Sequence, residues 1–574
     1  MAVTTDGERR QATAARGLAG IADFATRSHA RAVVVLVVAV LLNILPGFFA
    51  IPPSDRDEAR FAQATKQMLE TGDYIDIRFQ DDVRYKKPVG IYWLQAAAVK
   101  VGKGLGVREA LTTIWLYRLP SLFGAISAVL LTYWTALAFV TQRAAVLAGL
   151  MMATCILMSF EGRIAKTDAV LLASVVAAMG ALARAYLPEQ RKWLGPQSGW
   201  LLPAIFWTAL AAGVLLKGPV ILMVVGLTAG TLVVIDRSAA WLLALRPLAG
   251  IAWFGVLVLP WFLAIVARSG ESFFAESIGR DLVSKLASGQ ESHGAPPGYY
   301  LAVFWVTFWP GAALAALAAP AVWSARRESG AKFLLAWMVP SWIVFEMVIT
   351  KLPHYVLPLY PAIAILIAGI VDGRMLSNRS WLRRGTIWWF LIPLLFGIAG
   401  IVGLLVIGRQ FGFLVWPVVG ASVVMGLLAW QLYDADGAGH SLLRAATAAI
   451  LLTMAVFGLI LPVLPQLFPS ATLAGIMRES GCAEPLAAAV GYHEPSLVFL
   501  AGTSTRLTDA AGAADFLRGG DCRFAFVEAR QERAFAQRAD AIGLQYSPGG
   551  RVDAINTGIA RPITIAVYRS GGVQ

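Results

Sequence analysis

Charged residues are scarce in this chain. Only 14% of its 574 residues are Asp, Glu, Lys or Arg, whereas 58% are hydrophobic. An ordinary soluble globular protein is about a quarter charged, so the composition argues against that class. The apolar runs reach the roughly 20 residues that an α-helix needs to cross a bilayer. We therefore predict a polytopic membrane protein.

Cysteine is also rare, and its spacing supports neither a zinc motif nor a redox motif. The chain has three cysteines and no CxxC pair. Cys482 and Cys522 both fall in the last hundred residues or so. An exported compartment would permit a disulfide between them, and two free buried cysteines are an equal alternative. We find no internal repeat and no low-complexity tract.

The excess of positive charge does not indicate nucleic-acid binding. The formal net charge is +13, but much of the Lys and Arg lies in short links between apolar runs. No basic face is interleaved with base-stacking aromatics. Every second link carries the Lys and Arg excess, which is typical of the cytoplasmic side of a membrane protein. The pattern predicts a cytoplasmic N-terminus.

The apolar runs divide the chain into three regions. Residues 1–31 are polar and Arg-bearing with no cleavage-site pattern, which predicts an uncleaved cytoplasmic tail. Residues 32–464 hold about thirteen predicted membrane spans by the length criterion. These spans are predicted at 32–51, 112–140, 144–161, 168–187, 199–216, 219–235, 248–267, 299–322, 333–350, 354–372, 386–408, 412–432 and 444–464.

Residues 465–574 are predicted to form a small α/β domain. Pro465 and Pro469 break the apolar pattern, and short apolar runs then alternate with helical patterns. An odd number of spans places this domain on the non-cytoplasmic side. Strands are predicted at 487–491, 497–501, 524–527 and 563–567, and helices at 509–517 and 531–542.

The densest group of acids, bases and aromatics lies between the first two predicted spans, in residues 54–95. Asp57 and Glu58 lie at the start of a predicted amphipathic helix that ends at Thr71-Gly72-Asp73. Charges are costly to place at the mouth of a membrane bundle. Their concentration here therefore predicts a functional site.

Asp57 is the candidate proton acceptor for an attacking hydroxyl. The alternative is an N-cap, because Asp at a helix start accepts hydrogen bonds from free backbone N–H groups, and Ser54 or Asp55 could serve equally. Nearby cations would keep Asp57 ionised, which makes it available but a weak base. Asp168 is a second candidate acid. Its alternative is a structural ion pair with Arg163 or Lys166.

Four cations on the non-cytoplasmic face are candidates for a clamp around phosphate or pyrophosphate. Arg offers bidentate contacts to phosphate, whereas Lys acts as a point charge. For Arg60 and Lys87 the alternative is that they are interfacial side chains that snorkel to the membrane surface. The loop at 268–298 is rich in Gly and Pro, which suits a lid over a substrate, and a plain connector is its alternative. The four cations are Arg60, Lys87, Lys217 and Arg280.

Short motifs in a fixed order carry a family resemblance. The chain resembles the bacterial membrane glycosyltransferases of the dolichyl-phosphate-mannose–protein mannosyltransferase-like group, and in layout the lipid A aminoarabinose transferases among them. The motifs are Asp57-Glu58-Ala59-Arg60-Phe61, Lys87-Pro88 with Tyr92-Trp93, Arg163 to Asp168, Lys217-Gly218 and Lys351-Leu352-Pro353-His354-Tyr355.

The resemblance implies a GT-C fold, a mainly α bundle in the bacterial inner membrane with catalytic periplasmic loops at 52–111 and 268–298. It also implies a polyprenyl-phosphate-linked sugar donor and inverting transfer to a hydroxyl of lipid A, another envelope lipid, a glycan or a protein. By position, Asp57 and Asp168 would be the site acids. The substrate-binding candidates are Glu58, Arg60, Lys87, Lys217, Arg280, His354 and Tyr355.

The chain departs from the aminoarabinose transferases at positions associated with a metal. Those proteins tend to have an acid where this chain has Lys86, and histidines around Ala275 and Ser277. No cofactor is predicted, and a divalent metal stays open as an alternative. A lipid or solute transporter is the rival function, but transporters usually hold polar residues near the midplane and have related halves. A scaffold that displays the C-terminal domain is a third interpretation.

Overall fold

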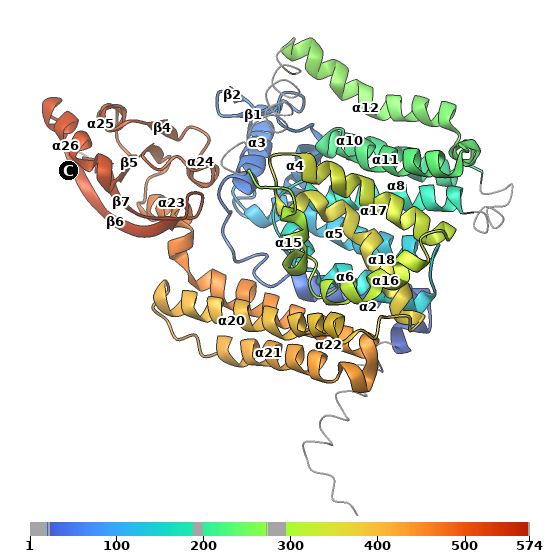
Figure 1. Cartoon of the computed structure of the whole chain (residues 1–574). Helices are drawn as coiled ribbons and strands as arrows, with labels where there is room; N and C mark the ends of the chain where they lie inside the picture. The colour runs from blue at the N-terminus through green and yellow to red at the C-terminus, as the bar shows by residue number, and fades with distance from the viewer. Residues whose placement is uncertain (1–19, 21–22, 188–198, 271–272, 274–293, 572–574) are drawn as a thin grey trace, which may run out of the picture.

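The computed structural model describes residues 20, 23–187, 199–270, 273 and 294–571. Figure 1 shows a helical bundle with a small α/β domain beside it, formed by the C-terminal part of the chain. The predicted fold class, a mainly α polytopic membrane protein with a small C-terminal α/β domain, is confirmed.

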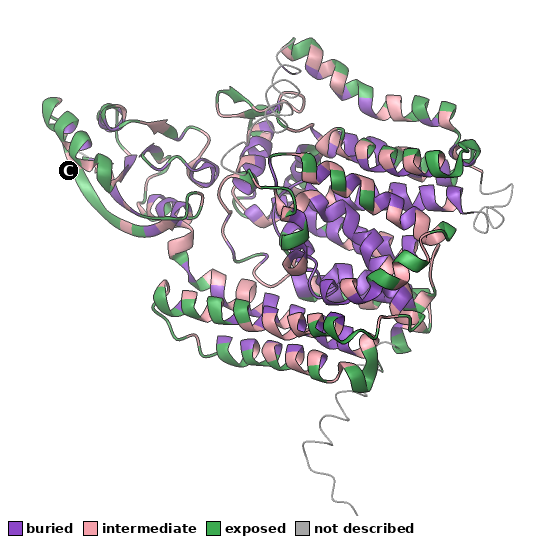
Figure 2. Ribbon diagram, viewed as in Figure 1, coloured by how far each residue is buried: buried purple, intermediate pink, exposed green. Residues whose placement is uncertain are grey.

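The centre of the bundle is α8 (Asp168–Tyr186), which is buried over most of its length (Figure 2). Small residues allow its neighbours to come close, as is usual between membrane helices. At Gly124 a Cβ atom would lie 2.7 Å from the backbone nitrogen of Val170, so α5 meets α8 backbone to backbone. Helices α5 (Ile114–Ala136) and α10 (Leu201–Lys217) pack against α8. Helix α6 (Gln142–Thr154) packs against α5, and α2 (His29–Ile44) and α18 (Tyr360–Asp372) pack against α6.

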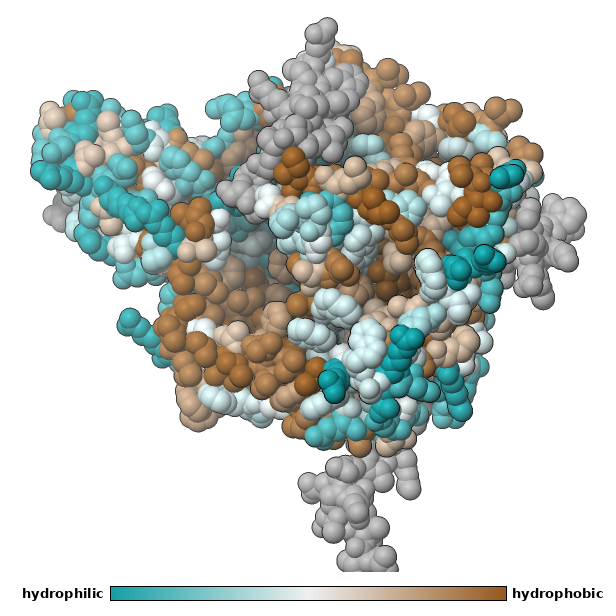
Figure 3. Space-filling model, in the orientation of Figure 1, coloured by the Kyte–Doolittle hydropathy of each residue, from teal (hydrophilic) through white to brown (hydrophobic). Residues whose placement is uncertain are grey.

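The outer helices turn apolar side chains outward. Leu248 and Leu263 of α12 are 87% and 65% exposed, and apolar surface covers much of the bundle, whereas the C-terminal domain is largely hydrophilic (Figure 3). Such a surface is stable against lipid. The outer helices are α11 (Val220–Asp236), α12 (Pro247–Ser269), α15 (Tyr299–Thr307), α16 (Ala312–Ser324), α17 (Ser329–Met347), α20 (Trp388–Val406), α21 (Val415–Gln431) and α22 (Tyr433–Thr453).

The predicted count of about thirteen spans is not confirmed. In the described ranges, six helices are long and apolar enough to cross a membrane, or up to seven if the bent pair α15 and α16 forms one span. Four further apolar helices are shorter. Apolar runs that look continuous in sequence are broken in the structure. The predicted span at 144–161, for example, is split into α6 and α7 (Ile156–Glu161) by an extended backbone at Cys155.

The predicted amphipathic helix at the start of the polar stretch is confirmed as α3 (Asp57–Thr71). It ends at Gly72, whose left-handed φ of 74° suits a glycine C-cap. A short hairpin of β1 (Arg78–Phe79) and β2 (Asp82–Val83) follows, and α4 (Gly90–Gly104) returns to the bundle. These elements lie between the bundle and the C-terminal domain (Figure 1).

The C-terminal domain is a five-stranded sheet in the order β4-β3-β5-β7-β6. Its strands β3, β4 and β5 are parallel, and β7 is antiparallel to both β5 and β6. A disulfide joins Cys482 to Cys522. The strands are β3 (Leu486–Val490), β4 (Arg506–Thr508), β5 (Arg523–Glu528), β6 (Tyr546–Asn556) and β7 (Arg561–Ser570), and the helices are α23 (Pro469–Glu479), α24 (Pro495–Ala501), α25 (Ala510–Arg518) and α26 (Glu532–Ala541).

Three of the four predicted strands and both predicted helices of this domain are confirmed, and the strand predicted at 497–501 is wrong. Those residues belong to α24. Pro495 occupies its first turn, where the missing N–H costs nothing. A continuous apolar run of five residues has no periodicity that separates a buried strand from a buried helix. The prediction also missed β4 and β6.

Candidate active site

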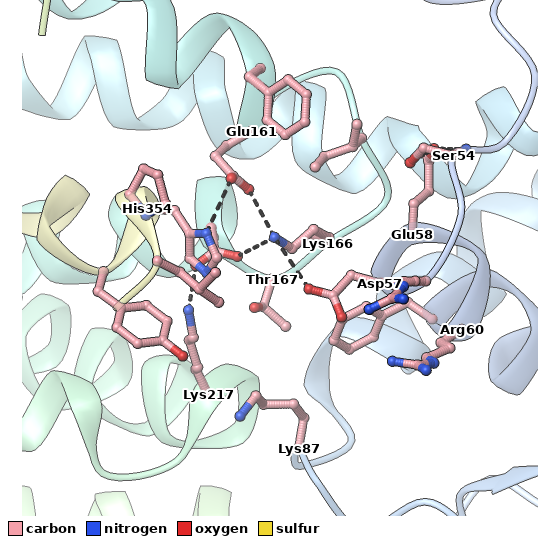
Figure 4. A pocket seen from close by; sticks show the side chains of 18 of the residues that line it. Ser54, Asp57, Glu58, Arg60, Lys87, Glu161, Lys166, Thr167, Lys217 and His354 are labelled. Carbon is pink, nitrogen blue, oxygen red and sulfur yellow. Dashed lines mark hydrogen bonds and ion pairs between the residues drawn. The ribbon is translucent and has the colours of Figure 1, made fainter. Parts of the chain in front are cut away.

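A cavity of about 390 Å³ opens where α3 meets the ends of several bundle helices. Segments that are distant in sequence supply its wall, and Figure 4 shows their side chains converging. The lining comprises residues 54–58, 60–61, 84, 86–87, 157, 160–161, 164, 166–168, 217, 350 and 352–355. Residues 353–355 of this lining belong to a 3₁₀ segment, η5 (Pro353–Leu359).

Asp57 is the first residue of α3, and its side chain is 52% exposed where it faces the cavity. The residue before it, Arg56, has a left-handed φ of 64° and occupies the N-cap position. No side-chain hydrogen bond caps this helix start in the described structure. The geometry therefore does not support the alternative that Asp57, Asp55 or Ser54 serves as the N-cap.

Positive charge around Asp57 keeps its carboxyl ionised. Burial raises the pKa of Asp57, but the field of Lys166, His354, Arg84 and Arg60 outweighs that effect and lowers the pKa below its usual value. The sequence-based expectation of an available but weak base is consistent with this environment.

Lys166 lies at the centre of a group of three acids. Its Nζ atom is 3.7 Å from Asp57 Oδ2, 3.7 Å from Glu161 Oε2 and 3.7 Å from Asp168 Oδ2. Its side chain is buried. Burial lowers the pKa of Lys166, but the surrounding carboxylates outweigh burial and raise it, so the amine is charged. Dashed lines in Figure 4 mark these contacts.

Asp168 begins α8 and has two further basic neighbours, Lys217 and His354. Lys217 donates a hydrogen bond to its Oδ1 atom. His354 bridges two of the acids, with Nε2 at 3.9 Å from Asp168 Oδ1 and Nδ1 at 3.6 Å from Glu161 Oε1. Of the two ion-pair partners considered for Asp168, Lys166 is in contact. Arg163 instead donates to the carbonyl oxygens of Asn43, Ile44 and Ser159.

The remaining predicted cations divide into two groups. Arg60 and Lys87 line the cavity with Lys217, whose Nζ also lies 5.3 Å from the ring centroid of Tyr355. In Figure 4 the ammonium groups of Lys87 and Lys217 point into the cavity from the side opposite Glu161. Arg280 lies outside the described residues, as does most of the loop predicted to form a lid.

Glu58 lines the cavity, but its carboxylate is engaged in holding the structure together. Arg118 of α5 donates to it at 2.7 Å, and the pair is buried. The backbone nitrogens of Ser54 and Ala165 donate to the same carboxylate at 2.8 and 3.0 Å. Glu58 therefore fixes the first turn of α3 against α5 and the link that carries Lys166.

Comparisons with known proteins agree with the resemblance. Residues 89–271 match the family described as dolichyl-phosphate-mannose-protein mannosyltransferase. The undecaprenyl phosphate-alpha-4-amino-4-deoxy-L-arabinose arabinosyl transferase of Edwardsiella ictaluri is 29% identical over 425 residues, which cover 71% of each chain. The protein of the same name from Erwinia tasmaniensis is 28% identical over 68% of this chain and 71% of its own.

The fold has a solved counterpart. The structure of ArnT from Cupriavidus metallidurans bound to undecaprenyl phosphate superposes with a TM-score of 0.72 at 19% identity, over 93% of this chain and 97% of that one. The resemblance expected from the motifs is confirmed. The chain is a membrane glycosyltransferase.

The glycosyltransferase also has an apolar groove beside its cavity, with a volume of about 550 Å³. Residues of α4, α5 and α8 line it, among them Ala97, Leu116, Phe123 and Ala173. The helix α8 connects the two spaces, because Asp168 at its start lines the cavity and Val170 lines the groove.

Sequence reasoning underrated three residues of this glycosyltransferase. From the sequence, Lys166 enters only as a possible partner for Asp168, and Glu161 and Arg118 are not among the predicted site residues. A charge within an apolar run is itself a functional or structural signal, and Arg118 carries that signal. The convergence of Glu161 and Lys166 on Asp57 depends on tertiary contacts, which no local pattern encodes.

Proposed function

We propose that the enzyme transfers a sugar from a polyprenyl-phosphate donor to a hydroxyl acceptor with inversion, on the periplasmic side of the bacterial inner membrane. The observation that carries this proposal is the joint placement of one ionised acid, Asp57, and the cations Lys87 and Lys217 around a single cavity. The relatives named undecaprenyl phosphate-aminoarabinose transferases favour a donor of the same chemical class.

The reaction assigns one role to each group. The acceptor oxygen attacks the anomeric carbon from the face opposite the phosphate, and the bond from that carbon to the phosphate oxygen breaks. The acceptor proton passes to Asp57, and the phosphate leaves with both electrons of the broken bond. Lys87, Lys217 and Arg60 stabilise the charge that develops on the phosphate oxygens. Asp168 holds Lys217 in place for this task.

The apolar groove suits the lipid tail of the donor. Each CH₂ group of a polyprenyl chain that is buried in the groove favours binding by about 0.8 kcal/mol. A groove of this kind therefore contributes binding energy remote from the reacting atoms. The tail would leave the cavity along α8, the helix that lines both spaces.

The periplasmic orientation draws support from the two cysteines of the C-terminal domain. The bond between Cys482 and Cys522 suits an oxidising compartment such as the periplasm. This orientation agrees with the distribution of Lys and Arg between alternate links, which predicts a cytoplasmic N-terminus.

The decisive experiment compares wild type with Asp57→Asn in proteoliposomes that contain undecaprenyl-phosphate-linked sugars and envelope lipids. Mass spectrometry of the lipids should show an acceptor heavier by one sugar with wild type and not with the variant. Asp82→Asn, in the exposed β2 strand, is the matched control and should transfer normally. Full transfer by Asp57→Asn would refute the role of Asp57, and solute uptake without transfer would favour a transporter.

A further inference from the structure

The described residues do not fit a bound divalent metal, although the resemblance left one open. No group of three or more His, Cys, Asp and Glu side chains in the described ranges is arranged to hold a metal ion. Three carboxylates do converge, those of Asp57, Glu161 and Asp168, but their common centre is filled by the ammonium group of Lys166.

The geometry makes Lys166 a shared counter-ion, since its three distances are equal and none is short enough for a hydrogen bond. Glu161 Oε2 and Asp168 Oδ2 are buried atoms without a hydrogen-bond partner in the described structure. Lys166 is the cation that both of these atoms face. Buried carboxylates repel one another unless a cation compensates them, so Glu161 and Asp168 depend on this amine, which also pairs with the more exposed Asp57.

The other two basic groups beside these acids, Lys217 and His354, cannot replace it. Lys217 reaches Asp168 from the side of Tyr355, and no ion pair joins it to Asp57 or Glu161 in the described structure. His354 contacts Glu161 and Asp168 at 3.6 and 3.9 Å but does not contact Asp57. Among the described residues, Lys166 alone connects the proposed proton acceptor to the two acids behind it.

We propose that Lys166 is a built-in cation that takes the position a divalent metal would hold among these acids, and that it positions Asp57 for proton transfer. This inference rests on the proposed function for the role of Asp57. Lys166 is a positioning residue, because it acts on the reaction through the carboxylate of Asp57. Neutralising it would release the Asp57 side chain from the wall of the cavity and leave two buried acids in repulsion.

The inference predicts that removing the amine creates a cation site. Lys166→Ala leaves a space surrounded by three carboxylates, and carboxylate oxygens are the ligands that Ca²⁺ prefers, at about 2.3–2.6 Å in adaptable geometry. The acids would have to close in by roughly 1 Å to reach that distance. Lys217→Ala, which removes a cation that touches only Asp168 of the three acids, is the matched control.

The test measures Ca²⁺ binding and sugar transfer separately on the full-length protein in detergent. Lys166→Ala should bind Ca²⁺ in titration calorimetry and melt at a higher temperature with it, whereas wild type and Lys217→Ala should do neither. Adding Glu161→Gln to Lys166→Ala should weaken Ca²⁺ binding at least about 10-fold, because one of the three carboxylate ligands is lost. These readouts need no donor, so they stand even if the proposed reaction is wrong.

The transfer assay decides the positioning role. Lys166→Ala should lower the turnover number at least about 100-fold, the usual scale for a misplaced proton acceptor, with little change in the apparent KM for the donor. Ca²⁺ should restore part of that turnover, and wild type should keep full turnover in EDTA. Loss of wild-type turnover in EDTA with recovery on adding a divalent metal would overturn the inference, as would a Lys166→Ala variant that neither binds Ca²⁺ nor loses turnover.

If Lys166→Ala does not fold, Lys166→Gln keeps most of the length of the side chain and a polar end without the charge. Lower turnover of this variant at an unchanged melting temperature supports the inference, and wild-type turnover overturns it. The EDTA measurement on wild type is independent of either variant.

Discussion

Ser496 of the C-terminal domain donates a hydrogen bond to Asp55, two residues before Asp57. Neighbouring contacts extend this junction along α3, because Lys66 donates to the carbonyl oxygen of Phe499 at 3.0 Å and Gln63 donates to Thr503 at 2.8 Å. The C-terminal domain is therefore hydrogen-bonded to α3, the helix that presents the proposed catalytic acid, and to the segment just before it.

The junction should weaken as pH rises through about 6. Burial raises the pKa of Asp55 to about 6, and the nearby charge of Glu494 adds to that effect. A group whose pKa is higher in the docked state binds its proton more tightly there. Docking is therefore most stable below the usual Asp pKa, near 4, and loses this contribution as pH rises through about 6. Melting of the full chain from pH 4 to pH 8 measures it.

Asp55→Asn is the matched variant for this pH dependence, since its amide cannot ionise. The variant should show a flatter stability profile between pH 4 and pH 7 than wild type. A profile identical to that of wild type would mean that another group controls docking. Ser496→Ala should leave the pH dependence in place, because burial of Asp55 is its main cause.

The buried pair of Glu58 and Arg118 predicts a large loss of stability when it is broken. Their side chains are 0% and 1% exposed, and Arg118 also donates to the carbonyl oxygens of Phe48 and Ile51. Removing one partner leaves a buried charge without compensation, which costs about 3–5 kcal/mol. Arg118→Met and Glu58→Gln should therefore both lower the free energy of unfolding in denaturant titrations.

The double variant Glu58→Gln/Arg118→Met tests whether the loss comes from the uncompensated charge. It should be less destabilised than the sum of the two single variants. Additive losses would show that the two side chains act independently, through their separate backbone contacts.

The sequence predicted the elements that have a strong local signal. Residues 57–71 show helical spacing and a Gly stop, and the structure forms that helix. The strand predicted at 497–501 failed because a buried run of five apolar residues carries no period, and Pro495 began a helix instead. The span count is not confirmed, and hydropathy does not register breaks such as the one at Cys155.

The composition of the candidate site was predictable only in part. Asp57, Lys87 and Lys217 each stand at the end of an apolar run, where a charge is conspicuous, and the structure brings them to one cavity. The ammonium of Lys166 among three acids is different, because it depends on how α3 packs against the link before α8. Such contacts between distant segments have no signature in a single sequence.

Lys87 and Lys217 should affect donor binding more than proton transfer. Both line the cavity on the side proposed for the phosphate, and a charge-assisted hydrogen bond contributes about 1.5–3 kcal/mol. Lys87→Met should therefore weaken binding of undecaprenyl phosphate by about 10- to 100-fold in titrations without acceptor. Lys103→Met, at an exposed position outside the cavity lining, is the control and should bind within about 3-fold of wild type. Equal losses in both variants would point to a general effect of charge.

The apolar groove between α4, α5 and α8 should discriminate donors by tail length. Ala97 lines this groove and its small side chain is exposed there, so Ala97→Trp fills the space without disturbing the packed core. The variant should raise the apparent KM for a long polyprenyl donor about 10-fold, equivalent to about 1.4 kcal/mol of lost apolar contact. A donor with a two-isoprene tail should be used nearly as well as by wild type, because such a tail does not extend along the groove.

Leu222→Trp, on the outward face of α11 where Leu222 is 42% exposed, controls for a bulky residue at a lipid-facing position. If Ala97→Trp slows both donors equally, the groove does not hold the donor tail, and it becomes a candidate for the acyl chains of a lipid acceptor.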